Sequence, residues 1–291
     1  MEPYLLIPLG TGFVYTLGAL CLKRSTNDGV GPWRTTFVSN LFIFAIAQVF
    51  WFLGDPIESF SSLWVPFLIS ILFFLGQLAT CFAIHKGDVS VVTPILGTKP
   101  VFIGLISVVV FSQSLSTGLW IAALLSSVAV FLLRGSTHAE KKRLLPSILI
   151  GIAGSFSYSI SDTLMGVYGA EIGFENLIAV SFSLIGLWSL SLIPFFSSPF
   201  STIPKRSKNW LYLGSAFLAL QGAAMAFAVI STGKATTMNI LYSSRGIWSI
   251  LLVWLIGHWF SNQEKHLGAK ILIRRLIGSL LLVVAIVLAI G

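Results

Sequence analysis

Charged residues are scarce in this chain of 291 residues. Lysine, arginine, aspartate and glutamate together make up 10% of it, whereas a soluble domain carries about 25%. Hydrophobic residues make up 56% of the sequence, and they stand in long runs rather than in amphipathic stripes. The composition therefore excludes an ordinary soluble domain and indicates a protein that lies within a membrane.

Cysteine is almost absent as well. Cys21 and Cys81 are the only two, they lie far apart within apolar runs, and their spacing matches no metal site. The motifs of several enzyme classes are missing too: no His-Glu-x-x-His for zinc, no Gly-x-Ser-x-Gly nucleophile elbow and no P-loop. We therefore expect free thiols, no metal, no cofactor, no catalytic residues and no enzymatic activity.

The chain has instead a succession of ten apolar runs. About 20 apolar residues cross roughly 30 Å of hydrocarbon as a helix, because the rise per residue is about 1.5 Å. Lipid offers the backbone no hydrogen-bonding partner, so each run must be helical. We predict an all-α polytopic membrane protein with transmembrane helices near residues 3–22, 33–53, 63–85, 90–111, 117–133, 146–167, 174–196, 209–231, 236–257 and 272–290.

The longest polar connection lies at the middle of the chain. It contains Lys141-Lys142-Arg143 and separates the fifth predicted helix from the sixth. We therefore predict a first five-helix repeat over residues 1–134, a linker over 135–145 and a second five-helix repeat over 146–291. A chain duplicated in this way completes its own cavity, so a monomer is sufficient for function.

The net charge of +8 does not indicate a nucleic-acid partner, because the basic residues lie mostly in short connections between apolar runs. Fifteen lysines and arginines flank the odd-numbered connections, whereas the even-numbered connections carry only Lys234. The positive-inside rule places the more basic side of a membrane protein in the cytoplasm. The bias predicts a protein of the cell (inner or plasma) membrane with both termini outside, in contact with membrane lipid.

An internal repeat supports the division into halves. Residues 10–17 resemble residues 153–160 at an offset of 143, and a second correspondence, at an offset of 146, aligns Lys99 with Arg245. Because five helices is an odd number, the two repeats should be inverted relative to each other. Transporters built in this way bind their substrate near the bilayer midplane, between the repeats.

The ten helices in a 5+5 arrangement resemble the drug/metabolite transporter superfamily, specifically its EamA-like members. The stretch from Gly87 to Pro94, continued by Lys99-Pro100-Val101, is similar to the start of that family's fourth helix, where the family often has Glu-Pro in place of Lys99-Pro100. The resemblance implies a central cavity among helices 1, 3, 4, 6, 8 and 9. It also implies that both termini are cytoplasmic, the reverse of what the charge bias predicts.

Three charged residues fall inside apolar runs: Lys99, Asp162 and Arg245. A charge near the bilayer centre costs about 2.5–3.5 kcal/mol, so it normally faces a cavity or a partner. If the repeats align, Lys99 and Arg245 lie at comparable depth and make a site for an anion, which arginine grips through two donors and lysine as a point charge. The alternative is that one of them pairs structurally with Asp162, which still leaves one positive charge unmatched.

Asp162 itself has three possible roles: structural partner of a cation, proton carrier, or ligand for a substrate amine. The helix near residues 90–111 is expected to be loosened beside Lys99 by Pro94, Gly97 and Pro100, either to line a cavity or as an ordinary kink. Other candidate substrate-binding residues are polar or aromatic, and for each single polar one the alternative is an interhelical hydrogen bond. They are Tyr15, Gln77, Thr98, Tyr158, Gln221, Asn239, Ser244 and Trp248.

These observations favour a secondary transporter that moves a small organic or phosphorylated anion by alternating access between the two repeats. One alternative is a proton-coupled exporter of cationic or neutral amphiphiles or amino acids, with Asp162 as its central charge. A second alternative is a membrane enzyme or a scramblase.

Overall fold

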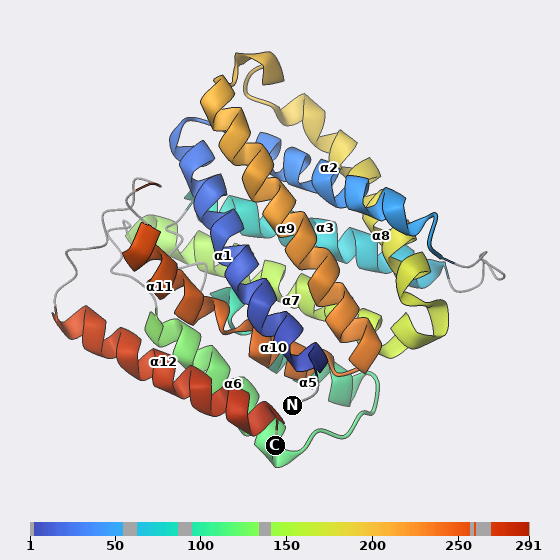
Figure 1. Ribbon diagram of the computed structural model, residues 1–291, viewed down its shortest axis with the longest axis vertical. Coiled ribbons are helices and arrows are strands. Elements are labelled where there is room, and N and C mark those ends of the chain that lie inside the picture. The colour runs from blue at the N-terminus through green and yellow to red at the C-terminus, as the bar shows by residue number, and fades with distance from the viewer. Residues whose placement is uncertain are drawn as a thin grey trace.

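The computed structural model describes residues 3–54, 63–86, 95–133, 141–256, 259 and 269–290, and within these ranges the secondary structure is helical (Figure 1). Short 3-10 helices lie at the N-terminus (η1, Pro3–Leu5), at the end of the seventh predicted span (η3, Leu190–Phe195) and after that span (η4, Phe200–Thr202). The α-helices are α1 (Leu6–Asn27), α2 (Pro32–Phe50), α3 (Trp64–Lys86), α5 (Lys99–Val109), α6 (Thr117–Leu133), α7 (Lys141–Ile172), α8 (Phe174–Ser189), α9 (Lys205–Thr232), α10 (Ala235–Tyr242), α11 (Arg245–Ile256) and α12 (Ala269–Ile290).

Several of these helices suit a membrane. Five segments are long and apolar enough to cross one by length and composition alone: Leu6–Thr26, Trp64–Ala83, Ile148–Ile172, Phe174–Phe195 and Lys205–Thr232. Shorter apolar helices cover Lys99–Val109, Thr117–Leu132 and Leu276–Ile290. Large hydrophobic side chains point outward around the bundle, as Phe52 and Val109 do with 89% and 77% of their surface exposed. Such a surface is stable only where lipid covers it.

The helix boundaries agree with the predicted spans except where polar residues extend a helix. α1 continues to Asn27 rather than ending near residue 22, and α7 begins at Lys141 rather than near residue 146. Lysine and arginine are good helix formers, so a helix continues past its apolar run into water. The first residues of the predicted linker, 135–140, and the predicted start of the fourth span, 90–94, lie outside the described residues.

Two spans are broken at their middle. A turn at Gly97–Thr98 precedes α5, and a turn at Ser243–Ser244 separates α10 from α11. The first break lies where the sequence predicts loosening. The second is a correction, because residues 236–257 were predicted as one continuous helix. Each break is followed at once by a cation, since α5 begins at Lys99 and α11 begins at Arg245.

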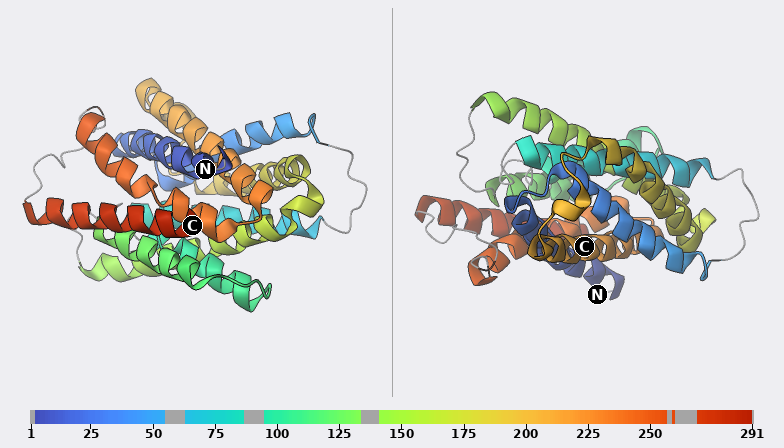
Figure 2. Two further views of the ribbon diagram at one scale, coloured as in Figure 1. Left: turned by 60° about the horizontal axis from the view of Figure 1, so that its bottom comes forward. Right: turned by 90° about the horizontal axis from the view of Figure 1, so that it is seen from above.

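Helices of one half pack against helices of the other half in a symmetric pattern. The first helix of each half packs along the third helix of the other, α1 along α9 and α7 along α3. The second helices pair with each other, α2 with α8, and so do the fifth helices, α6 with α12, which run side by side in both views (Figures 1 and 2). This pattern relates the halves by a pseudo-two-fold operation. The chain therefore has ten membrane-spanning helices in two inverted five-helix repeats, as the sequence predicts.

The crossing of α1 and α9 depends on glycine. A Cβ built on Gly214 would lie 2.9 Å from the carbonyl oxygen of Gly18, and one built on Gly18 would lie 3.1 Å from that of Gly214. Backbones in membranes approach this closely only through small residues, and close packing replaces the hydrophobic driving force that is weak in lipid. The two halves are therefore held together tightly at this crossing.

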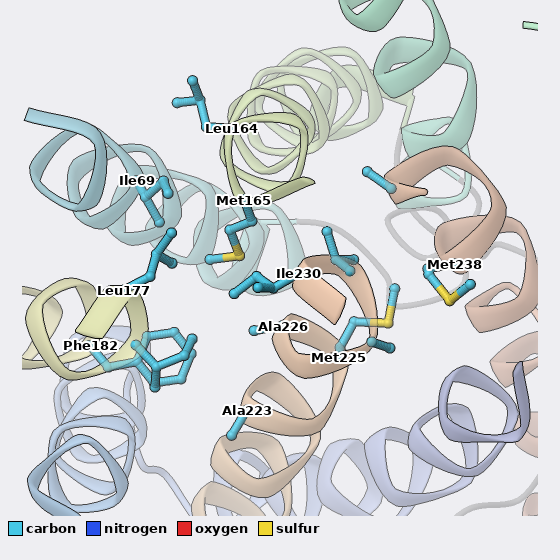
Figure 3. Packing of buried hydrophobic residues seen from close by; sticks show 14 of the residues in the cluster. Ile69, Leu164, Met165, Leu177, Phe182, Ala223, Met225, Ala226, Ile230 and Met238 are labelled. Atoms are coloured by element: carbon cyan, nitrogen blue, oxygen red, sulfur yellow. The ribbon is translucent and has the colours of Figure 1, made fainter. Parts of the chain in front are cut away.

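The main hydrophobic core fills the space among α3, α7, α8, α9 and α10 (Figure 3). It includes Ile69, Met165, Phe182, Ile230 and Met238, and the side chain of Phe182 is fully buried. Because these helices come from both halves, the core fixes one repeat against the other, and through α10 it includes part of one broken span.

Two connections from different halves meet at one end of the bundle. The hydroxyl of Ser25 donates to the carbonyl of Ser207 (3.1 Å), and the hydroxyl of Ser207 donates to Oδ2 of Asp28 (3.0 Å). A guanidinium nitrogen of Arg34 donates to the hydroxyl of Ser198 (2.9 Å). The first and seventh connections therefore lie on the same side. The two chain ends, marked N and C, lie close to each other (Figure 1).

Candidate substrate site between the two halves

Lys99 is the centre of one half of the candidate site. Its Nζ lies 2.7 Å from Oδ2 of Asp162 and 5.3 Å from the ring centroid of Tyr158, both on α7. The same carboxylate oxygen accepts a hydrogen bond of 2.7 Å from the side-chain amide of Asn239 on α10. Helical spacing explains the arrangement, because residues four apart, such as Tyr158 and Asp162, share one face. The charge of Lys99 is therefore matched by a carboxylate from the opposite repeat.

Arg245 is the centre of the other half. Its Cζ lies 5.0 Å from the ring centroid of Tyr15 on α1 and 4.7 Å from that of Tyr242 on α10, and the two rings meet edge to face. One guanidinium nitrogen is 3.4 Å from the hydroxyl of Tyr242. Arg245 is 8% exposed. Within the part of the chain that the structure describes, it forms no ion pair with a carboxylate.

The two cations are held in equivalent ways. Each follows a turn that interrupts its span, and each lies over a tyrosine of the opposite half, Lys99 over Tyr158 and Arg245 over Tyr15. The two tyrosines are themselves equivalent, at the offset of 143 residues. The backbone contacts repeat as well. Ser159 donates to the carbonyl of Lys99 (3.3 Å), and Thr16, its equivalent at that offset, donates to the carbonyl of Arg245 (3.4 Å).

The turns themselves pack against the first helix of the opposite half. The hydroxyl of Thr98 lies 3.3 Å from that of Ser155. The residue equivalent to Ser155 is Gly12, and a Cβ built there would lie 3.0 Å from both the amide nitrogen of Arg245 and the hydroxyl of Ser244. The absence of a side chain at position 12 therefore allows the turn before Arg245 to pack this closely against α1.

The broken backbone near Lys99 is satisfied by protein. Ser127 on α6 donates a hydrogen bond of 3.0 Å to the carbonyl of Gly97, and Thr98 donates one of 2.6 Å to the carbonyl of Ile95. Non-helical backbone at membrane depth requires such partners. The interruption is thus a built feature of the span rather than a frayed helix.

The charges at the centre do not cancel. Lys99 and Asp162 neutralise each other, and Arg245 remains without a carboxylate partner among the described residues. A cation over a desolvated aromatic face gains about 2 kcal/mol, so two tyrosine rings offset much of the cost of burying the guanidinium without removing its charge. The described residues thus leave one positive charge in the interior between the repeats.

Several buried polar atoms around this charge have no partner among the described residues. They include Nε of Arg245, the hydroxyl of Ser244 and Oδ1 of Asn239. A buried polar atom without a partner costs about 1–3 kcal/mol, so water or a ligand is expected to meet these atoms. The set offers donors for an anion from Arg245 and Ser244 and an acceptor from the amide of Asn239. Oε1 of Gln77 on α3 is also buried without a partner among the described residues, and the role of Gln77 in substrate binding stays a prediction.

Two predicted site residues lie differently from the rest. The indole of Trp248 is turned to α1, where its Nε1 donates to the carbonyl of Leu9 (3.1 Å) and its ring meets Phe13 edge to face at 5.3 Å. Gln221 on α9 is half-buried, and no described contact joins it to either cation. Trp248 therefore joins α11 to α1, and the role of Gln221 in substrate binding stays a prediction.

Tyr242 is a site residue that was missing from the prediction. It contacts the Arg245 guanidinium through both its ring and its hydroxyl. It stands three residues before Arg245, and this helical spacing could have identified it as a neighbour. The repeat does not identify it, because the equivalent residue in the first half is Leu96.

Two cavities lie away from the cations. One, of about 320 Å³, is lined by Trp33, Arg34, Phe82 and Phe195 among others, and the other, of about 420 Å³, lies between α3 and α7. Neither of these two is lined by Lys99 or Arg245. These two cavities are therefore separate from the two cations.

Comparison with known proteins agrees with this architecture. Residues 3–135 match the model of the EamA-like transporter family. The first half of the chain is an EamA-like transporter domain. A crystal structure of a protein with 16% sequence identity superposes with a TM-score of 0.76 over 99% of this chain and 98% of that one, which extends the fold to the full length. No curated protein matches the chain.

The EamA-like family belongs to the drug/metabolite transporter superfamily, and its members are transporters rather than enzymes. The protein that contains this EamA-like domain is accordingly a multi-pass membrane protein and a secondary transporter of a small molecule. The family resemblance of the sequence and the ten-helix inverted repeat are both confirmed.

Proposed function

We propose that the transported molecule is an organic or phosphorylated anion that binds to Arg245 between the two repeats. The observation that carries this proposal is the unmatched guanidinium, buried between Tyr15 and Tyr242 and without a carboxylate partner in the described chain. An anion would neutralise it and would also reach Ser244, whose buried hydroxyl lacks a partner there. Arginine suits this role because it offers paired donors to a carboxylate, sulfonate or phosphate.

The two repeats, residues 1–134 and 146–291, would rock around this site in alternating access. Lys99 belongs to the first repeat, whereas Asp162 and Asn239 belong to the second, so their contacts tie the two repeats together. Because Arg245 is only 8% exposed and lies between the repeats, a substrate reaches it when the repeats move apart. A single chain supplies all of these groups, which supports a monomer as the functional unit.

The main alternative places the substrate on Asp162 as an exported cationic or neutral compound. It is less favoured because that carboxylate already has Lys99 at 2.7 Å and the amide of Asn239 at 2.7 Å. A substrate amine would have to displace a buried lysine. Proton carriage by Asp162 would likewise have to disrupt this pair, and it belongs to the same alternative.

The first test is ligand-induced thermal stabilisation of the purified transporter, because a ligand that binds the native state raises its apparent stability. The panel contains carboxylates, sulfonates, phosphorylated compounds and organic cations. Arg245→Ala should weaken anion binding by about 30-fold or more, since it removes a desolvated charge partner. Arg245→Lys should retain part of the binding. The matched control is Arg206→Ala, which removes an exposed arginine far from the cations.

Uptake by vesicles that contain the same variants tests transport itself. If anions stabilise the wild type and drive exchange, and Arg245→Ala abolishes both, the proposal stands. Stabilisation by cations alone, unchanged in Arg245→Ala and lost in Asp162→Asn, would replace it with the exporter alternative. Movement of lipid without solute flux would favour a scramblase.

For orientation we propose that the odd-numbered connections face the cytoplasm and both termini lie outside the cell membrane. The support is the concentration of basic residues on those connections and the contact of the first connection with the seventh, through Arg34 and Ser198. A reporter that fluoresces only in the cytoplasm, fused after Gly291, should remain dark. A bright reporter would reverse the orientation.

A further inference from the structure

The position that decides the charge of the site is Ala19. At the offset of 143 that aligns Tyr15 with Tyr158 and Thr16 with Ser159, Asp162 aligns with Ala19. Both residues stand four positions after the tyrosine that lies beneath a cation, so each shares a helix face with that tyrosine. The contacts of the two tyrosines with the two cations therefore support the equivalence of Ala19 and Asp162, in addition to the sequence alignment.

The contacts show what this substitution changes. In one half, the carboxylate at this position pairs with Lys99 at 2.7 Å. In the other half, the cation again lies over the tyrosine, at 5.0 Å from the Tyr15 centroid, but the position holds a methyl group. The half-buried side chain of Ala19 leaves Arg245 without the partner that Lys99 has.

We propose that Ala19 and Asp162 together set the substrate charge, so that the site takes a carboxylate or sulfonate with a single negative charge in preference to a doubly charged phosphate. This inference rests on the proposed function, because it assumes that the anion binds at Arg245. One singly charged group neutralises the Lys99–Asp162–Arg245 set. A second negative charge would remain uncompensated in an interior where unpaired charges are costly.

The test compares two probes, ethanesulfonate and glycerol 3-phosphate, at pH 8, where the phosphate carries close to two charges. Wild type should bind ethanesulfonate at least about 10-fold more tightly, a preference of about 1.4 kcal/mol. Ala19→Asp supplies the missing partner of Arg245 and should weaken ethanesulfonate binding by about 30-fold. Asparagine has nearly the same size as aspartate but no charge, so the affinity of Ala19→Asn for ethanesulfonate should lie within about threefold of that of the wild type.

A second variant keeps the test decisive if Ala19→Asp does not fold. Asp162→Asn removes the carboxylate of the other half and raises the charge of the set to two, so it should shift preference about 10-fold toward glycerol 3-phosphate. The double variant Ala19→Asp/Asp162→Asn moves the unmatched cation from Arg245 to Lys99. Its binding of ethanesulfonate should recover and should then be lost when Lys99→Ala is added.

The outcomes separate this inference from the proposed function. If Arg245→Ala abolishes ethanesulfonate binding but the preference between the probes is the same in wild type and Asp162→Asn, the anion site stands and the role of Ala19 and Asp162 is refuted. Equal weakening by Ala19→Asp and Ala19→Asn also refutes it, because size rather than charge would be responsible. If no anion binds the wild type, both proposals are wrong.

Discussion

The regions around Lys99 and Arg245 are two versions of one local structure. Both cations begin a half-helix after a two-residue turn, both lie over a tyrosine of the opposite half, and both have a carbonyl that accepts from a hydroxyl one residue after that tyrosine. They differ in the residue four positions after the tyrosine, Asp162 in one case and Ala19 in the other. One copy thus forms an ion pair between the halves, whereas the other leaves its cation without a carboxylate partner among the described residues, where we propose that a ligand binds.

The largest effect that this comparison predicts is on stability. Lys99→Ala leaves Asp162 buried without its cation and should lower the free energy of unfolding by about 3–5 kcal/mol. Arg245→Ala removes an unmatched charge and should lower it by less than about 1 kcal/mol. Chemical unfolding of both variants in the same detergent measures the difference. Equal losses of stability would mean that the two regions do not differ in this way. The double variant Lys99→Ala/Asp162→Ala, which has no unpaired carboxylate, should regain most of the stability.

The next effect concerns the second partner of Asp162. Asn239→Ala removes a hydrogen bond of 2.7 Å to a charged acceptor and should cost about 1.5–3 kcal/mol. In an Asp162→Ala background the same change should cost much less, because its partner is already gone. A double-mutant cycle by chemical unfolding measures the coupling. Additive losses would show that the amide stabilises something other than the carboxylate.

The fit of the turn before Arg245 predicts an effect of similar size. A methyl group at Gly12 would lie 3.0 Å from the backbone nitrogen of Arg245, so Gly12→Ala should destabilise the protein by about 1–3 kcal/mol. Gly10→Ala, on the same helix, is the matched control, since a Cβ there has nothing within 4 Å. The thermal unfolding midpoints of the two variants should therefore separate, and coincident midpoints would rule out a tight fit.

The smallest effect is expected at Trp248. Trp248→Phe retains a ring against Phe13 but loses the hydrogen bond to the Leu9 carbonyl, which should cost about 0.5–1.5 kcal/mol. Because the indole faces α1 rather than the cations, anion affinity should not change. Titration of this variant with ethanesulfonate, beside Tyr242→Phe, checks the assignment. A loss of affinity in Trp248→Phe alone would return this residue to the substrate site.

The architecture could be predicted from the sequence because apolar runs mark the helices directly and the internal repeat can be found by aligning the two halves. The break near Lys99 was also predictable, since proline and glycine mark it. The break at Ser243–Ser244 was not, because the stretch from Ala235 to Arg245 contains neither residue. There the interruption depends on packing against Gly12 in a helix more than 200 residues away, which no local pattern records.

The ion pair of Asp162 also depends on contacts between distant helices that the sequence does not show. The sequence left open which cation pairs with Asp162, and the packing of α5 against α7 gives the carboxylate to Lys99. Trp248 was placed near Arg245 by helical spacing, but spacing does not say which neighbouring helix an indole faces. Among the candidates, Tyr15, Thr98, Tyr158, Asp162, Asn239 and Ser244 lie around the two cations, and their roles in substrate binding remain predictions.

The two interrupted spans have a further electrical consequence. Every α-helix is polar along its axis, with the equivalent of about half a positive charge at its N-terminus, and cations there are ordinarily disfavoured. α5 and α11 both begin at the interruption and both carry a cation as their first residue. At the second interruption, α10 ends at Tyr242 and brings the opposite, negative helix end to the same turn. The two backbone contributions therefore oppose each other there, so the charge that an anion meets is set mainly by the side chains.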